Sequence, residues 1–343
     1  MFFQTSKVMV PTDFAKLLTG FLTGYLPHER GMSTNTLKAY KDTFILLINY
    51  MAANGIKAEN LSLAQLNRDN INGFLDWLQD ERGAGNSTRN ARLAAIRSFY
   101  LYVQYEAPER LYETQRILSI RAKRTEKPTI EYLAVEGIML LLRQPDVNTH
   151  RGLRDVALLS LMYDTGARVQ EIIDLTPGCV RFDTPFTIRI TGKGNKTRIV
   201  PLQKEQVRLL QKYMEANKLD KEQAHPEPLF FNSRKEKFTR AGVSHILLKY
   251  AALARKQNDR LIPKISCHSI RHSKAMHLLQ AGVNLVYIRD FLGHVSIQTT
   301  EVYARADSKE KRQALEKAYV EVKPEVNPFW LENKNLLGWL KSF

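Results

Sequence analysis

A basic segment without large apolar side chains divides the chain and constrains its fold more than any other feature. The segment runs from Arg121 to Pro128, carries four Arg and Lys residues and ends in a proline, which is typical of a linker. The length of 343 residues also suits about two domains of ordinary size. We therefore expect one domain over residues 1–120, the linker over 121–128 and a second domain over 129–310.

Apolar residues before the linker recur at the spacing of helices. Three stripes are apparent, over residues 37–51, 71–78 and 93–103. Ser33 and Asn35 are cap candidates for the first stripe, and the run Asn86-Ser87-Thr88 is expected to cap the third. The first domain is therefore predicted to be a compact helical unit without β-structure.

The chain after the linker is predicted to be mostly helical with one β-hairpin. Apolar and polar residues alternate over residues 186–191, a turn follows at 192–195, and a second strand returns to Pro201. Further helical stripes cover residues 243–253 and 285–292, and Gly293 stands at the C-cap of the latter. Gly166 is expected to break the apolar helix that precedes Arg168. The expected fold class is mostly α with a small antiparallel β-sheet, built as a helical domain followed by an α+β domain.

The net charge indicates a polyanionic partner. There are 51 Lys and Arg against 35 Asp and Glu, a formal net charge of +16 at pH 7. With 44% hydrophobic and 9% aromatic residues, the composition excludes a disordered tail protein, a collagen-like fibre and a small disulfide scaffold. The positive excess would serve general solubility or, more specifically, the binding of nucleic acid.

The cysteines and the hydropathy pattern indicate an intracellular protein. Only two cysteines, Cys179 and Cys267, are present, which favours a reducing compartment without a structural disulfide. The longest strongly apolar run, residues 137–142, is far shorter than the ~20 residues that cross a bilayer. Residues 1–4 contain no basic stretch leading into an apolar region, so we expect neither a secretion signal nor a membrane partner.

Several common sites are missing from the sequence. There is no G-x-x-x-x-G-K-[ST] phosphate loop and no Cys-x-x-Cys pair, and the glycines of Gly192-x-Gly194 belong to the hairpin rather than to a helix start. His268, His272 and His277 have no Asp, Glu or Cys at ligand spacing beside them. We therefore expect no metal site.

Four segments carry the groups that phosphodiester transfer requires. Such transfer needs guanidinium groups for the phosphate charge, an acid for the leaving 5′-oxygen and a group near the attacking atom. The candidates are Arg168 with Glu171 one helical turn later, Lys193 at the hairpin tip, the pair His268 and Arg271, and His294 nine residues before Tyr303. Each alone has an ordinary alternative: a buried ion pair, a solvated turn lysine, a surface pair or a packing tyrosine.

Together, and in this order, the segments resemble the tyrosine recombinase family, also called phage-type integrases. That family carries T-G-x-R-x-x-E-[IL], a G-K-G-x-K hairpin, H-x-[LI]-R-H, L-G-H and a Tyr about nine residues later. The matching segments are Thr165-Gly166-Ala167-Arg168 with Glu171-Ile172, Gly192-Lys193-Gly194-Asn195-Lys196, His268-Ser269-Ile270-Arg271-His272, Leu292-Gly293-His294 and Tyr303. The stretches 36–40 and 90–100 also look like the family's core-binding domain, and the resemblance spans residues 12–310.

The resemblance implies a nucleophile and a phosphate clamp. Tyr303 would attack the scissile phosphate and form a 3′-phosphotyrosyl bond. Because that bond conserves the energy of the broken one, neither a metal nor another cofactor is expected. Arg168 and Arg271 would hold the non-bridging oxygens, and Glu171 would support them.

The resemblance also implies where the protons go. Lys193 would protonate the leaving 5′-oxygen, with Lys196 as its rival for that role. His268 would handle the tyrosine proton or hydrogen-bond the phosphate, and His294 would add a further donor.

Basic residues elsewhere are expected to follow the DNA backbone. They are Lys38, Arg89, Arg92, Arg97, Arg121, Lys123, Arg124, Lys196 and Arg198. The family implies a homotetramer on double-stranded DNA with specific recombination sites, formed from a monomer or weak oligomer. The C-terminal segment, residues 311–343, ends in many large apolar residues and would dock on the adjacent protomer or fold back on its own.

Several functions remain open at this point. The favoured one is a site-specific recombinase acting as integrase or transposase of a mobile element, in the bacterial cytoplasm and associated with the nucleoid. An Xer-like resolvase of chromosome or plasmid dimers is the alternative within the family. A type IB topoisomerase-like enzyme and a non-catalytic DNA-binding protein are the others.

Overall fold

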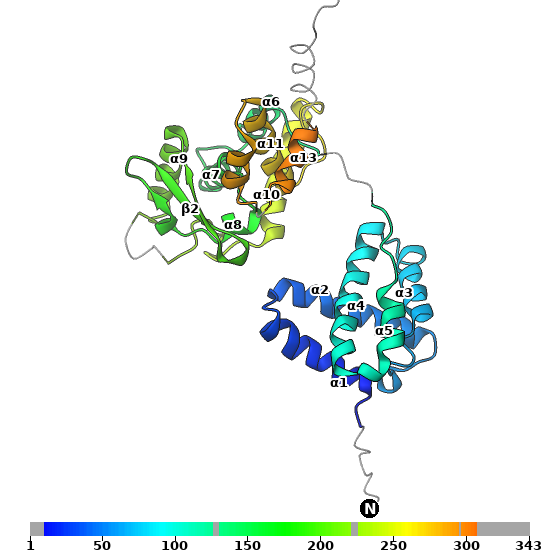
Figure 1. Ribbon diagram of the computed structural model, residues 1–343. Coiled ribbons are helices and arrows are strands. Elements are labelled where there is room, and N and C mark those ends of the chain that lie inside the picture. The colour runs from blue at the N-terminus through cyan, green and yellow to red at the C-terminus, as the bar shows by residue number, and fades with distance from the viewer. Residues whose placement is uncertain (1–9, 126–129, 221–225, 295, 307–343) are drawn as a thin grey trace, which may run out of the picture. The chain divides into compact units, whose positions relative to one another are not determined.

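The computed structural model of the protein describes residues 10–125, 130–220, 226–294 and 296–306 (Figure 1). The chain divides into two compact units, Met1–Lys127 and Pro128–Phe343. Both are mostly helical, and among the described residues β-strands occur only in the second. The predicted fold class is therefore confirmed.

The first unit is a helical bundle around an aromatic core. Its helices are α1 (Asp13–Gly20), the π-helical η1 (Phe21–Glu29), α2 (Thr34–Ala53), α3 (Arg68–Asp80), α4 (Asn86–Glu106) and α5 (Leu111–Leu118). Phe99 of α4 lies at the centre, with its ring centroid 5.4 Å from that of Phe21 and 5.2 Å from that of Phe44. The three predicted apolar stripes correspond to α2, α3 and α4, and each buries its stripe in this core.

The caps of these helices were predicted with mixed success. Ser33 caps α2, and its hydroxyl accepts a hydrogen bond from the backbone of Thr36. The cap expected from the run starting at Asn86 is wrong, because α4 already begins at Asn86 and its N-cap is Gly85. The side-chain amide of Asn86 instead donates to the carbonyl of Arg124 at 2.8 Å.

The first part of the basic segment is attached to the first unit. Asn90 of α4 donates to the carbonyl of Lys123 at 2.7 Å and accepts from its N–H at 3.0 Å. The Lys123 ammonium donates to Gln79 of α3 at 2.7 Å. Two neighbouring helices therefore hold the described start of the predicted linker.

The second unit places a small sheet beside a group of helices. The helices are α6 (Val135–Leu142), α7 (His150–Thr165), α8 (Val169–Ile173), α9 (Lys204–Ala216), α10 (Arg240–Gln257), α11 (Cys267–Gln280), α12 (Leu285–Leu292) and α13 (Gln298–Ala306). The strands are β1 (Val180–Arg181), β2 (Thr187–Thr191) and β3 (Thr197–Pro201), paired antiparallel in that order. Ile188, Ile190 and Val200 bury one face of the sheet in the main core of the unit.

The predicted hairpin is formed by β2 and β3. Ile188 pairs with Val200 and Ile190 with Arg198, so the two isoleucines share the inner face with Val200 and Arg198. Strand β1 was not predicted, because a strand of two residues has no alternation to detect.

Two helices end where the site begins. Gly166 follows α7 with φ of 56°, and Gly293 follows α12 with φ of 66°, a left-handed conformation that favours glycine. Both ends were predicted from the sequence. The chain that leaves these two helix ends leads to Arg168 and His294, respectively.

A second, smaller apolar cluster lies under the C-terminal helices of this unit. It joins α11, α12 and α13 through Ala275, Met276, Leu279, Ile288, Leu292 and Tyr303.

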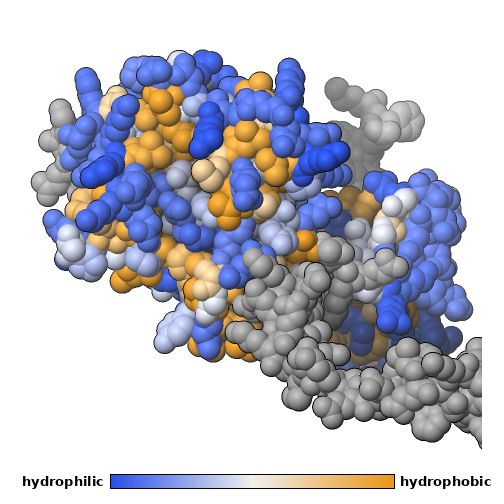
Figure 2. Space-filling view, turned by 90° about the horizontal axis from the view of Figure 1, so that it is seen from above, coloured by the Kyte–Doolittle hydropathy of each residue, from blue (hydrophilic) through white to orange (hydrophobic). Residues whose placement is uncertain are grey.

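The surface seen in Figure 2 is largely hydrophilic, with apolar patches between the polar residues. In the part of the chain that the structure describes, no helix combines the length and apolarity needed to span a membrane.

Candidate active site

The turn between α7 and α8 presents Arg168. This residue is the N-cap of α8, and its backbone N–H donates to Glu171 Oε2 at 3.0 Å while its Nη1 donates to Oε1 at 2.7 Å. One carboxylate thus fixes both the backbone and the guanidinium of Arg168. The Arg168 side chain keeps 35% of its surface exposed, so the guanidinium remains accessible to an anion.

Glu171 also binds a second arginine, from the hairpin. Arg198 Nη2 on β3 donates to Glu171 Oε2 at 2.7 Å, and the Arg198 side chain is only 11% exposed. Burial acts to raise the pKa of Glu171, but hydrogen bonds and charge from Arg198 and hydrogen bonds from Arg168 outweigh burial and lower it. Glu171 therefore stays ionised at neutral pH and holds the hairpin against α8.

Arg271 of α11 is buried and connects the ends of two other helices. Its Nη1 donates to the carbonyl of Gly166 at 2.7 Å and its Nη2 to the carbonyl of Leu292 at 2.8 Å. Burial and the charge of Arg168 lower the pKa of Arg271 to about 10, which leaves it charged at neutral pH. The guanidinium is therefore fixed in place before any ligand arrives.

Tyr303 of α13 lies in the same region of the unit. Its side chain is 3% exposed, and its hydroxyl forms a hydrogen bond with His272 Nδ1 at 2.9 Å. Its ring is stacked on that of His294, with centroids 6.3 Å apart. Burial raises the pKa of Tyr303, while the charges of Arg271 and Arg168 act to lower it.

The two other predicted histidines are held as neutral groups. His294 Nδ1 forms a hydrogen bond with Thr300 Oγ1 at 2.9 Å, and burial together with Arg271 lowers the pKa of His294 to about 4. His268 is exposed on α11, and burial of part of its ring and the charge of Arg271 lower its pKa. Neutral imidazoles can donate hydrogen bonds to a phosphate without adding charge.

A pocket of about 560 Å³ borders Arg168, Arg198 and His294 of this group. It is lined by Arg168, Gly192, Lys196, Thr197, Arg198, Arg289, Asp290, Gly293 and His294. Four cationic side chains against one carboxylate make this pocket suitable for an anion such as a phosphodiester.

The predicted lysines lie on and beside the hairpin turn. Lys193 begins the turn Lys193–Asn195, but its side chain lies outside what the structure describes. Lys196 follows the turn, is exposed and lines the pocket.

The residues expected to follow the DNA backbone differ in exposure. Six of them are exposed: Lys38, Arg97, Arg121, Lys123, Arg124 and Lys196. Arg92 is partly buried and donates to Ala39 and Thr43 of α2. Arg89 and Arg198 depart from the expectation of a surface cation, since Arg89 is 4% exposed and Arg198 faces Glu171.

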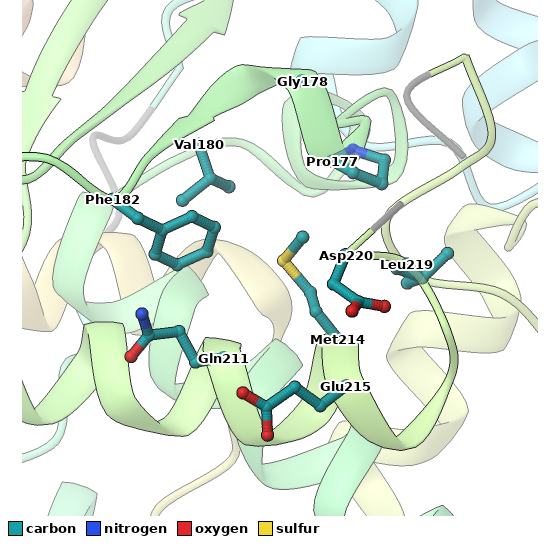
Figure 3. Close-up of a pocket in the computed structure, with 9 residues that line it drawn as sticks. All are labelled: Pro177, Gly178, Val180, Phe182, Gln211, Met214, Glu215, Leu219 and Asp220. Carbon is teal, nitrogen blue, oxygen red and sulfur yellow. The ribbon is translucent and has the colours of Figure 1, made fainter. Parts of the chain in front are cut away.

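A second pocket, of about 330 Å³, lies away from this cluster (Figure 3). Phe182 and Val180 face Met214 of α9 across it, with the carboxylate of Glu215 at the bottom of the view and that of Asp220 beside Met214. Apolar walls with two carboxylates do not suit a phosphate. The candidate site is therefore the first pocket.

Sequence reasoning missed the contact of His272 and the inward position of Arg198. His272 was visible as the last residue of His268-Ser269-Ile270-Arg271-His272, but spacing along α11 does not show that it meets α13. Alternation along β3 could have placed Arg198 on the inner face with Val200. Within the described residues, no three His, Cys, Asp or Glu side chains are grouped as metal ligands would be.

Two family descriptions match the two units. Residues 132–310 match the Phage integrase family, and residues 19–106 match the phage integrase N-terminal SAM-like domain.

Curated relatives cover most of the chain. The putative integrase/recombinase y4rC of Sinorhizobium fredii is 33% identical, over 89% of this chain and 91% of its own length. The tyrosine recombinase XerD of Listeria monocytogenes is 32% identical, over 81% and 90%. The tyrosine recombinase XerC of Myxococcus xanthus is 30% identical, over 90% and 99%.

Solved structures share the fold. The Tn1549 transposon integrase in complex with transposon right end DNA has a TM-score of 0.67 at 15% identity, over 88% of this chain and 98% of its own. The XerH site-specific recombinase bound to its difH substrate has a TM-score of 0.63 at 21% identity, over 84% and 81%.

The substitution Glu171→Gln tests the carboxylate that joins α8 to the hairpin. It should lower the free energy of unfolding at pH 7 by about 2 kcal/mol, because two arginines lose a charged hydrogen-bond acceptor. The folded-state pKa of Glu171 lies below its ordinary value of 4.5, so this contribution is fully present above pH 4.5 and is lost as the pH falls through the folded-state value.

Urea denaturation of wild type and variant from pH 7 down to pH 3 measures the difference. Asp174→Asn is the matched control, because this carboxylate lies at the end of α8 but is exposed. Its effect should stay below about 1 kcal/mol. An equal loss for Glu171→Gln at every pH would contradict the assignment.

Proposed function

This chain belongs to the phage integrase family of tyrosine recombinases, and on that premise we propose that it cleaves double-stranded DNA at specific recombination sites through Tyr303. The observation that carries the proposal is a buried tyrosine hydroxyl whose pKa is raised by burial, while the charges of Arg271 and Arg168 both act in the opposite direction. A phenol needs such cations to act as a nucleophile near neutral pH.

In this mechanism the two arginines hold the scissile phosphate. Arg271 is fixed by the helix ends and Arg168 by Glu171, so neither has to be ordered when DNA binds. Their charges stabilise the negative oxygens of the transition state. Donors on His268 and His294 add hydrogen bonds to the same phosphate.

The bonds change in one concerted exchange. A bond forms between Tyr303 Oη and phosphorus while the phenolic proton passes to a neighbouring base, and the bond from phosphorus to the 5′-oxygen breaks. Lys193 gives a proton to that oxygen as it leaves. Religation reverses the exchange, so the phosphotyrosyl bond conserves the energy and no cofactor is required.

The substitution Tyr303→Phe should abolish formation of a covalent adduct between protein and DNA. The substrate is a duplex with a nick beside the cleavage point, so that the released strand diffuses away and the adduct accumulates. Denaturing gel electrophoresis measures the product. Tyr287→Phe, at an exposed tyrosine of α12, should cleave as wild type does. Adduct from Tyr303→Phe would refute the assignment of the nucleophile.

A second substrate separates Lys193 from Lys196 as the acid. We expect Lys193→Ala to slow cleavage of ordinary DNA by about 10²–10⁴-fold, the range for loss of a general acid. DNA with sulfur in place of the 5′-bridging oxygen has a leaving group that needs no proton, so this variant should cleave it at nearly the wild-type rate. If the sulfur-containing DNA instead restored the cleavage rate of Lys196→Ala and not that of Lys193→Ala, the acid would be Lys196.

The first unit supplies a separate DNA-binding surface in this proposal. The exposed cations Lys38, Arg97 and Lys123 support contact with the DNA backbone. We assign residues 1–120 to DNA binding, 121–128 to the linker and 129–310 to catalysis.

We also propose that four protomers assemble on two DNA sites. The tetramer of lambda integrase bound to a Holliday junction, which shares this fold at 14% identity and a TM-score of 0.61, supports such an assembly. The segment 311–343 lies outside the described residues, and its apolar composition supports docking on a neighbouring protomer.

Deleting residues 325–343 should leave cleavage of the nicked substrate intact and reduce recombination of a plasmid with two sites at least about tenfold. The physical reason is the loss of apolar contact between protomers, which cleavage by one protomer does not need. Gel analysis of the plasmid products measures both outcomes. Unchanged recombination would contradict docking, and relaxed circles alone from the full chain would favour topoisomerase activity.

The biological role that we propose is integration or transposition of a mobile element. The similarity to an integrase/recombinase along 89% of the chain supports it. Resolution of chromosome or plasmid dimers is the second candidate, supported by the similarity to XerD and XerC. Mapping the covalent cleavage site on the DNA that flanks the gene distinguishes the two.

A further inference from the structure

The hydroxyl of Tyr303 has a specific partner that the mechanism above does not use. His272 Nδ1 lies 2.9 Å from Tyr303 Oη, and the two ring centroids are 5.6 Å apart. The tyrosine side chain is 3% exposed, so water has little access to this hydrogen bond. The proton that must leave the phenol therefore lies against His272.

His268 is placed differently. It lies one helical turn before His272 on α11, with its ring centroid 5.6 Å away, and it is exposed. Among the described residues, no hydrogen bond joins His268 to Tyr303. The more exposed histidine is thus positioned for a phosphate arriving from solvent, and the inner one for the nucleophile.

We propose that His272 is a catalytic residue that accepts the phenolic proton of Tyr303 during attack on the phosphate. The inference rests on the proposed role of Tyr303 as nucleophile. With its own proton on Nε2, His272 has a free lone pair on Nδ1. The proton passes from Tyr303 Oη to this Nδ1 as the bond from Oη to phosphorus forms. In religation, His272 returns the proton to the tyrosine.

The charges around His272 fit this role. On its own helix are His268 and Arg271, Tyr303 faces it from α13, and His294 follows α12. Burial, the neighbouring His268 and the charge of Arg271 lower the pKa of His272 to about 4, so the ring is neutral and its unprotonated nitrogen carries a lone pair.

The arrival of DNA strengthens His272 as a base. A phosphate bound at Arg271 places a negative charge beside the cation that lowers the pKa of His272, and so raises that pKa. The histidine would therefore gain basicity when the substrate is in place. Without DNA the same hydrogen bond keeps the tyrosine protonated.

The substitution His272→Asn distinguishes proton transfer from positioning. The Asn side chain reaches the position of Nδ1 and keeps a hydrogen bond to Tyr303, but it cannot take a proton at neutral pH. We expect its rate of adduct formation on the nicked duplex to fall at least about 10²-fold at pH 7. The rate should then rise about tenfold per pH unit as the tyrosine ionises in solution, whereas the wild-type rate changes little from pH 7 to 9.

Two controls accompany this variant. His150→Asn, at the far end of α7 from Gly166, should keep the wild-type rate and pH profile. The sulfur-bridged DNA should not rescue His272→Asn, because the missing group acts on the nucleophile and not on the leaving oxygen. A wild-type rate and pH profile for His272→Asn would overturn the proposal. Restoration of the cleavage rate of this variant by the sulfur-bridged DNA would overturn it as well.

A measurement on the wild-type protein is independent of the variants. The ¹⁵N NMR shifts of His272 should show the proton on Nε2. A proton on Nδ1, donated to the tyrosine oxygen, would overturn the proposal. If Tyr303→Phe still forms the adduct, the proposed nucleophile itself is wrong. If Tyr303→Phe is inactive while His272→Asn behaves as wild type, only the role of His272 is wrong.

Discussion

The buried guanidinium of Arg271 is the interaction on which the site depends. It binds the terminal carbonyls of α7 and α12, where the partial negative charges of two helix dipoles are concentrated. Those charges offset the cost of burying a cation. Since Arg168 and His294 follow directly on these two helix ends, the same hydrogen bonds that keep Arg271 charged also position its neighbours.

The balance of charge around Arg271 favours an anionic ligand. Glu171 is committed to Arg168 and Arg198, and both His272 and His294 have pKa values lowered to about 4. The folded protein therefore holds several cationic or neutral donors near one another with little compensating negative charge. The cationic side chains repel one another in the free protein, and a bound phosphate would reduce that repulsion. This reduction contributes to the free energy of phosphate binding.

Local patterns in the sequence predicted the elements well but not how they meet. Apolar residues at helical spacing predicted the helices, apolar–polar alternation predicted the hairpin, and Gly166 and Gly293 predicted two helix ends. Each of these signals depends only on residues that are close together in the chain. The start of α4, the burial of Arg89 and the contact from His272 to Tyr303 depend on packing between helices.

The candidate site shows the same division. The six predicted catalytic residues were selected by motif, and the structure describes the side chains of five of them within one unit. The roles of Arg198 and His272 were not apparent from spacing, since one depends on strand register and the other on how α13 crosses α11. Strand register and the packing angle between helices are determined by tertiary contacts, which cannot be read directly from one sequence.

The small apolar cluster beneath α11, α12 and α13 has a consequence for the energetics of the unit. Tyr303 anchors α13 in this cluster and not in the main core that surrounds the sheet. Opening of α13 therefore breaks few of the contacts that stabilise the rest of the unit, and its free energy is expected to lie well below that of global unfolding. Release of the helix that carries Tyr303 would then be a local opening that leaves the rest of the fold intact.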